Sequence, residues 1–209
     1  MSEKPILFKP EMVRAILEGR KTQTRRVLKP QPTKPWGSMF HEGRRWWTGD
    51  DFTAEVIEEM NVPFASGDLL WVREAWRVLP THDRTRPSDL APETTMIRYE
   101  ADGMRFGYGK LRPGMFMPRW ASRITLRVTG VRVERLQDIS EADAKAEGIE
   151  RLRSGRGYYD PRYDHGAVHL GYCATAVEAY SLLWDSINGP GAWDANPWVA
   201  VSTFERVRP

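Results

Sequence analysis

A lysine, a threonine and a glutamate are the residues of this sequence that could together hydrolyse an amide. Lys21 and Thr24 lie within GRKTQTRR, and Glu147 directly precedes a glycine. A lysine with a lowered pKa can act as a base, a threonine hydroxyl as a nucleophile or water-orienting group, and a carboxylate as a proton shuttle. The three residues therefore predict an amide-hydrolysing site, provided that the fold brings them together.

Lys21 and Thr24 also have a purely structural interpretation. A lysine after a helix C-terminus complements the helix dipole, and a threonine in a strand is common. Because side chains of an ideal strand alternate between its two faces, Lys21 and Thr24 converge only if Lys21 still belongs to the turn before the strand. On pattern alone, the structural interpretation has the advantage.

Glu147 occupies the last turn of a predicted helix over residues 140–148. A carboxylate at this negative end of the helix dipole typically costs about 0.3–1 kcal/mol. Lys145 and Arg151 could screen it if it were an exposed surface charge. An acid in an unfavourable position is also typical of functional sites, so the functional interpretation stays open.

The other candidate residues would bind a substrate rather than react with it. Glu74 lies in LWVREAW, and a buried carboxylate there needs a cationic partner, for which Arg25 and Arg26 are the candidates. Trp71 and Trp120 are suited to stack on a planar base, although large aromatic residues more often fill a core. The predicted substrate-binding residues are Arg26, Trp71, Glu74 and Trp120.

Composition indicates an ordinary globular protein with a mild preference for anionic partners. The 209 residues are 41% hydrophobic and 28% charged, with a net charge of +3 and a pI near 9.1. No apolar run approaches the ~18 residues of a membrane span, so no membrane association is expected. The N-terminus lacks the apolar region of a signal peptide, and the single cysteine, Cys173, cannot form an internal disulfide. These features predict a cytoplasmic location.

The sequence contains none of the familiar cofactor motifs. There is no GxxxxGK[ST], GxGxxG, HExxH or CxxC pattern. His165 and His169 have a spacing that suits a metal only on a helix, and the glycines in DHGAVHLGY make a helix there unfavourable. We therefore expect neither a metal nor another cofactor.

The predicted elements follow the order β-α-β, insertion, β, insertion, ββ, α, insertion, α, β. Cap residues predict helices over residues 10–19, 140–148 and 175–188. Residues 30–66 are predicted to be an insertion or extended loop, and residues 124–133 to be two strands with a turn at 129–130. This order predicts an α+β fold with a small, mostly antiparallel barrel or curled sheet.

Several segments resemble the ASCH-domain family of the PUA-like superfamily. They are ILEGRKTQTRR, GDLLWVREAW, RITLRVTGVRVERLQDISEADAKAEGI and FERV, and the most specific feature is the G-x-K-T-x-T-x-R pattern of the first. The resemblance covers essentially all the predicted ordered segments. It implies a single domain over residues 1–209, with insertions at about 30–66, 79–118 and 150–174 relative to compact members.

The resemblance implies a small β-barrel flanked by helices, with a cleft for RNA or modified nucleosides. Compact bacterial members are similar to amidohydrolases that deacylate N4-acetylcytidine and related N4-acylcytosines. Their catalytic lysine, threonine and glutamate correspond to Lys21, Thr24 and Glu147. The implied substrate is therefore a modified cytosine nucleoside or nucleobase, hydrolysed without a metal.

Other members of the family bind or cleave RNA, so the fold alone does not decide the function. The alternative hypothesis is a module that binds single-stranded RNA without amidase activity. In that case the cationic residues after the first helix would contact phosphates, and exposed tryptophans would stack on bases. A pure binding module has no need of the Lys21, Thr24 and Glu147 combination, which favours the enzyme.

Overall fold

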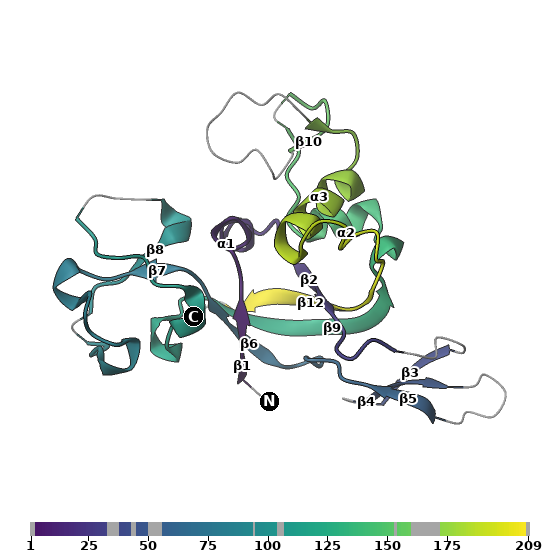
Figure 1. Cartoon of the computed structure of the whole chain (residues 1–209), viewed down its shortest axis with the longest axis horizontal. Coiled ribbons are helices and arrows are strands. Elements are labelled where there is room, and N and C mark those ends of the chain that lie inside the picture. Colours follow the sequence, from purple (N-terminus) through teal and green to yellow (C-terminus); the bar gives the residue numbers. More distant parts are fainter. Residues whose placement is uncertain are drawn as a thin grey trace. The chain divides into compact units, whose positions relative to one another are not determined.

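The chain folds as a mixed α+β protein with a mostly antiparallel sheet and few helices (Figure 1). The computed structural model describes residues 3–32, 38–42, 45–49, 56–93, 95–103, 107–152, 154–159 and 172–207. No helix in these ranges is both long enough and apolar enough to cross a membrane. The predicted fold class is confirmed at this level.

Five strands form the largest sheet, in the order β1-β6-β9-β12-β2. Their bounds are Glu3–Leu7 (β1), Leu69–Arg73 (β6), Thr125–Arg135 (β9), Trp198–Val207 (β12) and Gln23–Val27 (β2). Strands β1 and β6 are parallel, whereas β6–β9 and β12–β2 are antiparallel. Since β1 and β2 are edges, the strands that the structure describes do not close into a barrel.

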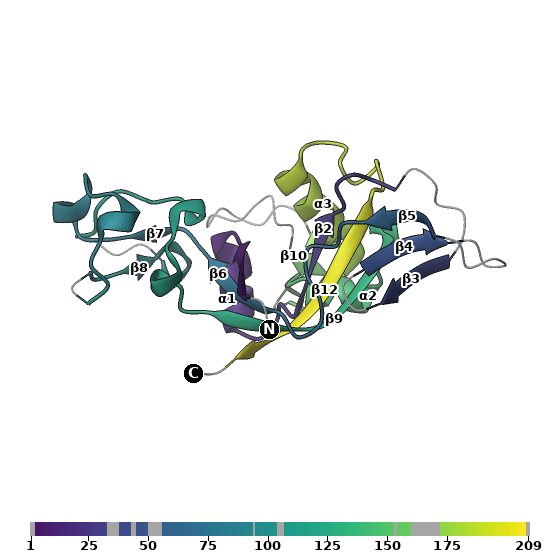
Figure 2. The ribbon, with the colours of Figure 1, turned by 90° about the horizontal axis from the view of Figure 1, so that it is seen from below.

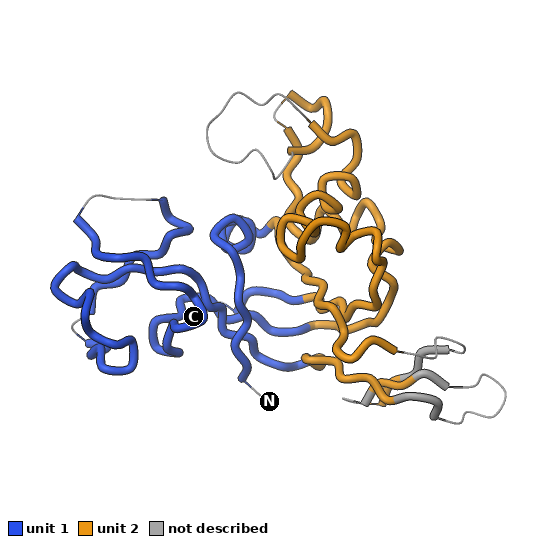
Figure 3. Tube along the Cα trace, viewed as in Figure 1, with its two compact units in different colours: residues 1–19, 67–128, 204–209 blue, residues 20–66, 129–203 orange. Residues whose placement is uncertain are grey.

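The chain divides into two compact units (Figure 3). The first contains residues 1–19, 67–128 and 204–209, and the second contains residues 20–66 and 129–203. The two longest described strands, β9 and β12, are neighbours in the sheet (Figure 2). Each of them has residues in both units. That the chain forms a single domain stays a prediction.

The second unit contains helices α2, Glu141–Ala146, and α3, Ala176–Asn188. Both begin at the predicted caps. The Ser140 hydroxyl accepts a hydrogen bond from the Asp143 N–H at 3.1 Å, and the Thr175 hydroxyl accepts one from the Glu178 N–H at 3.0 Å. These bonds satisfy N–H groups that have no partner within the helix, which explains why each helix starts where it does.

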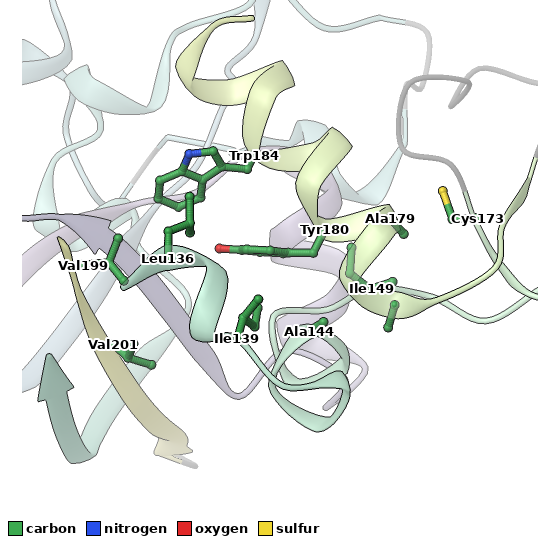
Figure 4. Packing of buried hydrophobic residues seen from close by; sticks show 11 residues of the cluster. Leu136, Ile139, Ala144, Ile149, Cys173, Ala179, Tyr180, Trp184, Val199 and Val201 are labelled. Atoms are coloured by element: carbon green, nitrogen blue, oxygen red, sulfur yellow. The ribbon is translucent and has the colours of Figure 1, made fainter. Parts of the chain in front are cut away.

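An apolar core joins α2 and α3 to strand β12 (Figure 4). Its buried members are Leu136, Ile139, Ala144, Ile149, Cys173, Ala176, Ala179, Tyr180, Trp184, Val199 and Val201. Val199 and Val201 alternate along β12, so they place the same face of this strand against the helices. The residues of β2 that pair with them, Val27 and Arg25, share this face.

Strand β9 corrects one prediction. The turn expected at 129–130 is absent, and β9 continues unbroken from Thr125 to Arg135. Gly130 has a different reason to be a glycine, because an added Cβ would lie 3.0 Å from the Thr203 hydroxyl of β12. The missing side chain leaves room for the Thr203 side chain of the neighbouring strand and does not serve a turn.

Residues 30–66 were predicted to be an insertion or extended loop, and the loop is wrong for residues 38–42, 45–49 and 56–60, which form strands. Strands β3 (Ser38–Glu42), β4 (Arg45–Gly49) and β5 (Val56–Met60) form an antiparallel three-stranded sheet. Trp46 of β4 is buried beside Leu28 and Met60, and its ring stacks on His41. Cross-strand aromatic packing of this kind stabilises a small sheet whose strands have no strict alternation.

The remaining elements are short. In the first unit they are α1 (Pro10–Leu17), β7 (Trp76–Arg77) and β8 (Arg98–Tyr99), and in the second β10 (Tyr158–Tyr159) and β11 (Tyr172–Cys173). Single turns of 3₁₀-helix cover Pro80–His82, Pro87–Asp89, Glu100–Asp102, Gly114–Phe116, Arg119–Ala121 and Leu136–Asp138. Helix α1 starts with Pro10 in its first turn, as predicted.

Candidate active site

The segment before β2 runs along the C-terminal end of α2. Three successive residues of this segment donate hydrogen bonds to three successive carbonyls: the Thr22 N–H to Ala146 O at 2.8 Å, Lys21 Nζ to Glu147 O at 2.9 Å and Arg20 Nη1 to Gly148 O at 2.9 Å. The last carbonyls of a helix lack partners within it and carry partial negative charge. Lys21 thus lies at a helix end, but at the end of α2 and not of the preceding helix α1, whose dipole it was expected to complement.

Lys21 also contacts the Glu147 side chain directly. Its Nζ lies 2.7 Å from Oε2, and the two side chains are only 1% and 3% exposed. This contact is possible because β2 begins at Gln23, so Lys21 still belongs to the connection after α1. Glu147 is thus a buried, paired carboxylate rather than a screened surface charge.

Burial lowers the pKa of Lys21. Loss of solvent around the ammonium is the largest cause, the Glu147 carboxylate opposes it, and the positive charges of Arg26 and Arg25 add to the lowering. A lysine with a lowered pKa carries more of the neutral amine near neutral pH than an exposed lysine does. This environment suits a general base.

Arg25 binds the second oxygen of Glu147. Its Nη1 lies 3.1 Å from Oε1, while Nη2 lies 2.7 Å from Glu134 and 3.4 Å from Asp143. Arg132 joins the last two carboxylates, at 2.7 Å from Glu134 and 3.0 Å from Asp143. A continuous ionic network therefore links the Lys21–Glu147 pair to β9 and α2.

Tyr180 of α3 borders this network. The Arg25 guanidinium carbon lies 5.9 Å from the centre of the ring, and Figure 4 shows the hydroxyl pointing into the apolar core toward Leu136. Burial, and secondarily the negative charge of Glu147, raise the pKa of Tyr180 well above its ordinary value. The phenol is therefore neutral near neutral pH and adds no charge to the network.

Thr24 is not joined to the pair. It lies directly across from Ser202 of β12, and since strand residues alternate, both point to the face opposite Arg25. Both residues are buried, and in the part of the chain that the structure describes no hydrogen bond links the Thr24 hydroxyl to Lys21 or Glu147. The structure thus brings together two of the three predicted catalytic residues.

Arg26 shares the Thr24 face of β2, by the same alternation. Burial lowers its pKa, and the negative charge of Glu147 opposes that effect. Arg26 is therefore close enough to the pair to contribute to its electrostatics, which fits its predicted place near a substrate.

Glu74 belongs to the first unit and has a partner that the sequence did not indicate. Arg123 binds it through two hydrogen bonds, Nε to Oε1 at 2.9 Å and Nη2 to Oε2 at 3.1 Å. The same guanidinium contacts Asp102 and lies 3.9 Å from the centre of the Tyr99 ring. The expectation that Arg25 pairs with Glu74 is wrong, because Arg25 is held by three carboxylates of the second unit.

Trp71 and Trp120 also lie in the first unit. Trp71 is 8% exposed, and the guanidiniums of Arg73 and Arg119 lie 4.5 and 5.9 Å from its ring centre. Trp120 is partly buried against the cluster around Trp76 and Met117. Arg73 covers one face of the Trp71 ring. A base could stack on that face only after Arg73 moves away.

The sequence interpretation missed the acidic side of the network. Arg132, Glu134 and Asp143 were not among the residues predicted to form the site. A signal was available, because Arg132 and Glu134 alternate with Val131 and Val133 along one strand. It marks a charged face, but it does not identify the partner of that face.

No group of three or more metal-ligating side chains occurs among the described residues, and His165 and His169 lie outside them. Comparisons with protein-family models, with curated proteins and with solved structures found no match to this chain.

Proposed function

We propose that the chain is an amidohydrolase that removes the acyl group from N4-acylated cytosine nucleosides, as a PUA-like member of the ASCH-domain family. The observation that supports this proposal best is the Lys21–Glu147 pair, with Nζ 2.7 Å from Oε2 and both side chains almost fully buried. Lysine and carboxylate are both groups that can transfer protons in a metal-independent amide hydrolysis.

Stability alone is a weak reason for such a pair. Removing an ammonium and a carboxylate from water costs several kcal/mol per ion, and apolar replacements of buried pairs are often neutral or stabilising. A cation at the end of α2 would satisfy the carbonyls without a buried carboxylate beside it. The added carboxylate is better explained by proton transfer.

The proposed reaction consumes one water and breaks the amide C–N bond. The neutral amine of Lys21 takes a proton from a water, or from the Thr24 hydroxyl if this side chain, which is not bonded to Lys21 in the structure, moves next to it, and the oxygen adds to the acyl carbon. The C–N bond then breaks, and the leaving N4 nitrogen receives the proton that Lys21 passes through Glu147. If Thr24 is the nucleophile, a water cleaves the resulting ester and releases the acid.

The arrangement limits what Glu147 can do. Nitrogen donors contact both of its oxygens, Lys21 at 2.7 Å and Arg25 at 3.1 Å. Glu147 is therefore placed to accept a proton from Lys21 and to pass it on, which is the role of a relay. Arg26, in the same unit as Lys21 and Glu147, is the substrate-binding residue proposed for this site, whereas Trp71, Glu74 and Trp120 stay predictions from the sequence.

The test is the absorbance change when N4-acetylcytidine is converted to cytidine and acetate. We expect turnover by the wild type and a loss of about 10²–10⁴-fold in Lys21→Ala, because this is the usual contribution of a positioned acid or base. Arg127→Ala, which alters an exposed pair with Glu205, is the control and should retain activity. Unchanged turnover in a folded Lys21→Ala variant would rule out the assignment.

A further inference from the structure

Arg25 lies at the centre of the ionic network and is fully buried, with a side-chain exposure of 0%. It reaches Glu147 with one terminal nitrogen, and Glu134 and Asp143 with the other. Arginine presents its donors in a rigid planar fork, so a guanidinium held by several carboxylates has a fixed position. Glu147 is consequently bound to a fixed point in the second unit.

A carboxylate held on one side only can rotate and can offer either oxygen. In Glu147 the two oxygens have different partners: Oε1 accepts a hydrogen bond from Arg25, and Oε2 accepts one from Lys21. The contact with Arg25 therefore decides which oxygen faces the lysine. Positioning within a fraction of an ångström matters for proton transfer, and misplacement by about 1 Å can cost on the order of 100-fold in rate.

We propose that Arg25 is a positioning residue for the hydrolysis: it holds Oε1 of Glu147 and leaves Oε2 as the oxygen that exchanges a proton with Lys21. This role rests on the proposed function. It adds a residue outside the lysine, threonine and glutamate of the family pattern, and this residue acts through Glu147 rather than on the substrate.

The charges around the pair determine the expected pH effect. Lys21 and Glu147 are faced by cations and carboxylates of β2, β9 and α2 and by the neutral phenol of α3: Arg25, Arg26, Arg132, Glu134, Asp143 and Tyr180. Arg25 is one of the two cations whose repulsion lowers the pKa of Lys21. Without it this pKa rises, so the amine becomes neutral only at higher pH.

The experiment compares Arg25→Met with the wild type in kcat and KM for N4-acetylcytidine across a pH series. We expect kcat to fall on the order of 100-fold, KM to change less than about threefold, and the acid limb of the profile to move to higher pH. Arg25→Lys keeps the charge but lacks the fork, so it should recover only part of the rate. Arg20→Met is the matched control, because Arg20 also binds the end of α2 but contacts Gly148 O and Glu150 instead of the Glu147 side chain.

Each outcome has a separate meaning. A folded Arg25→Met variant with wild-type kcat and an unshifted acid limb would overturn the role of Arg25 while leaving the hydrolase intact. A wild-type protein without turnover would overturn the proposed function itself. If Arg25→Met does not fold, Glu134→Gln loosens the opposite side of Arg25, and an unchanged kcat in that variant would count against the proposal.

Discussion

Lys21 donates to the main-chain carbonyl of Glu147 and to its carboxylate at the same time, at 2.9 and 2.7 Å. The first bond belongs to the end of α2, and the second belongs to the proposed chemistry. One side chain thus has a structural and a functional interpretation, and they do not exclude each other. A substitution of Lys21 must accordingly be judged by folding and by turnover in parallel.

Glu74 gives a prediction about stability and pH. Burial raises the pKa of its carboxyl above the ordinary value of 4.5, although Arg123 opposes the shift. The folded state therefore binds more protons than the unfolded state from pH 4.5 up to the raised value, and stability contributed by Glu74 is lost as pH rises through this window. Urea unfolding at a series of pH values should show the wild type losing stability relative to Glu74→Gln above pH 4.5.

A neutral substitution of a residue that is bonded to β6, the strand just before Glu74, provides the control. The Ser122 hydroxyl donates to Val72 O at 2.8 Å, so Ser122→Ala removes a hydrogen bond to β6 without removing a titrating group. Its difference from the wild type should be the same at every pH. If the stability difference between Glu74→Gln and the wild type is also independent of pH, burial does not raise the pKa of Glu74 as assigned.

Residue types could be predicted from the sequence, whereas their partners could not. Lys21 and Glu147 were selected because a lysine after a helix and an acid at a helix end are both noticeable locally. Their contact spans 126 residues, and no local spacing encodes it. The same limit explains why Arg123 was missed as the partner of Glu74.

At the scale of elements, signals that act within one turn were reliable. Pro10, Ser140 and Thr175 each mark a helix start, because capping depends on groups within three or four residues. The prediction failed at Gly130, where the local pattern resembles a turn but the cause lies on another strand. A single sequence does not indicate which strand will be the neighbour.

The close approach at Gly130 makes a second prediction. Gly130→Ala adds a Cβ 3.0 Å from the Thr203 hydroxyl, and we expect a loss of about 1–3 kcal/mol in the free energy of unfolding. The same substitution in a Thr203→Ala background should cost less, because the crowding oxygen is gone. Urea denaturation of the four proteins gives this difference directly, and equal costs in both backgrounds would show that crowding is not the cause.

At the scale of the whole molecule, the order of elements was sufficient for the fold class. Short strands that outnumber irregularly placed helices predicted a mixed α+β fold with a mostly antiparallel sheet, and this is what the described chain forms. The sheet over residues 38–60 was not predicted, because its strands lack the regular alternation of a half-buried strand. The stacking of Trp46 on His41 helps to stabilise this sheet instead.

Strands β9 and β12 each contribute residues to both units, so we expect the molecule to unfold in one cooperative transition. Leu126 and Leu136 are fully buried and lie in the first and second unit, respectively. Changing either residue to alanine should lower the free energy of unfolding by about 2–5 kcal/mol, and the protein should still unfold in one transition. Urea unfolding followed by tryptophan fluorescence and by circular dichroism checks this, with exposed Leu111→Ala as the control. Two separate transitions, each affected by only one substitution, would contradict it.

The pairing of β2 with β12 has a consequence for how the protein is made. The strand that carries Thr24 and Arg25 emerges from the ribosome before its sheet partner, which begins at Trp198, and before Glu147, the carboxylate that binds Lys21. Until these later segments have been synthesised, Lys21 and Arg25 lack the carboxylate of Glu147 and stay hydrated. We therefore expect the proposed active site to be among the last parts of the chain to assemble, since contacts over long sequence separations close late in folding.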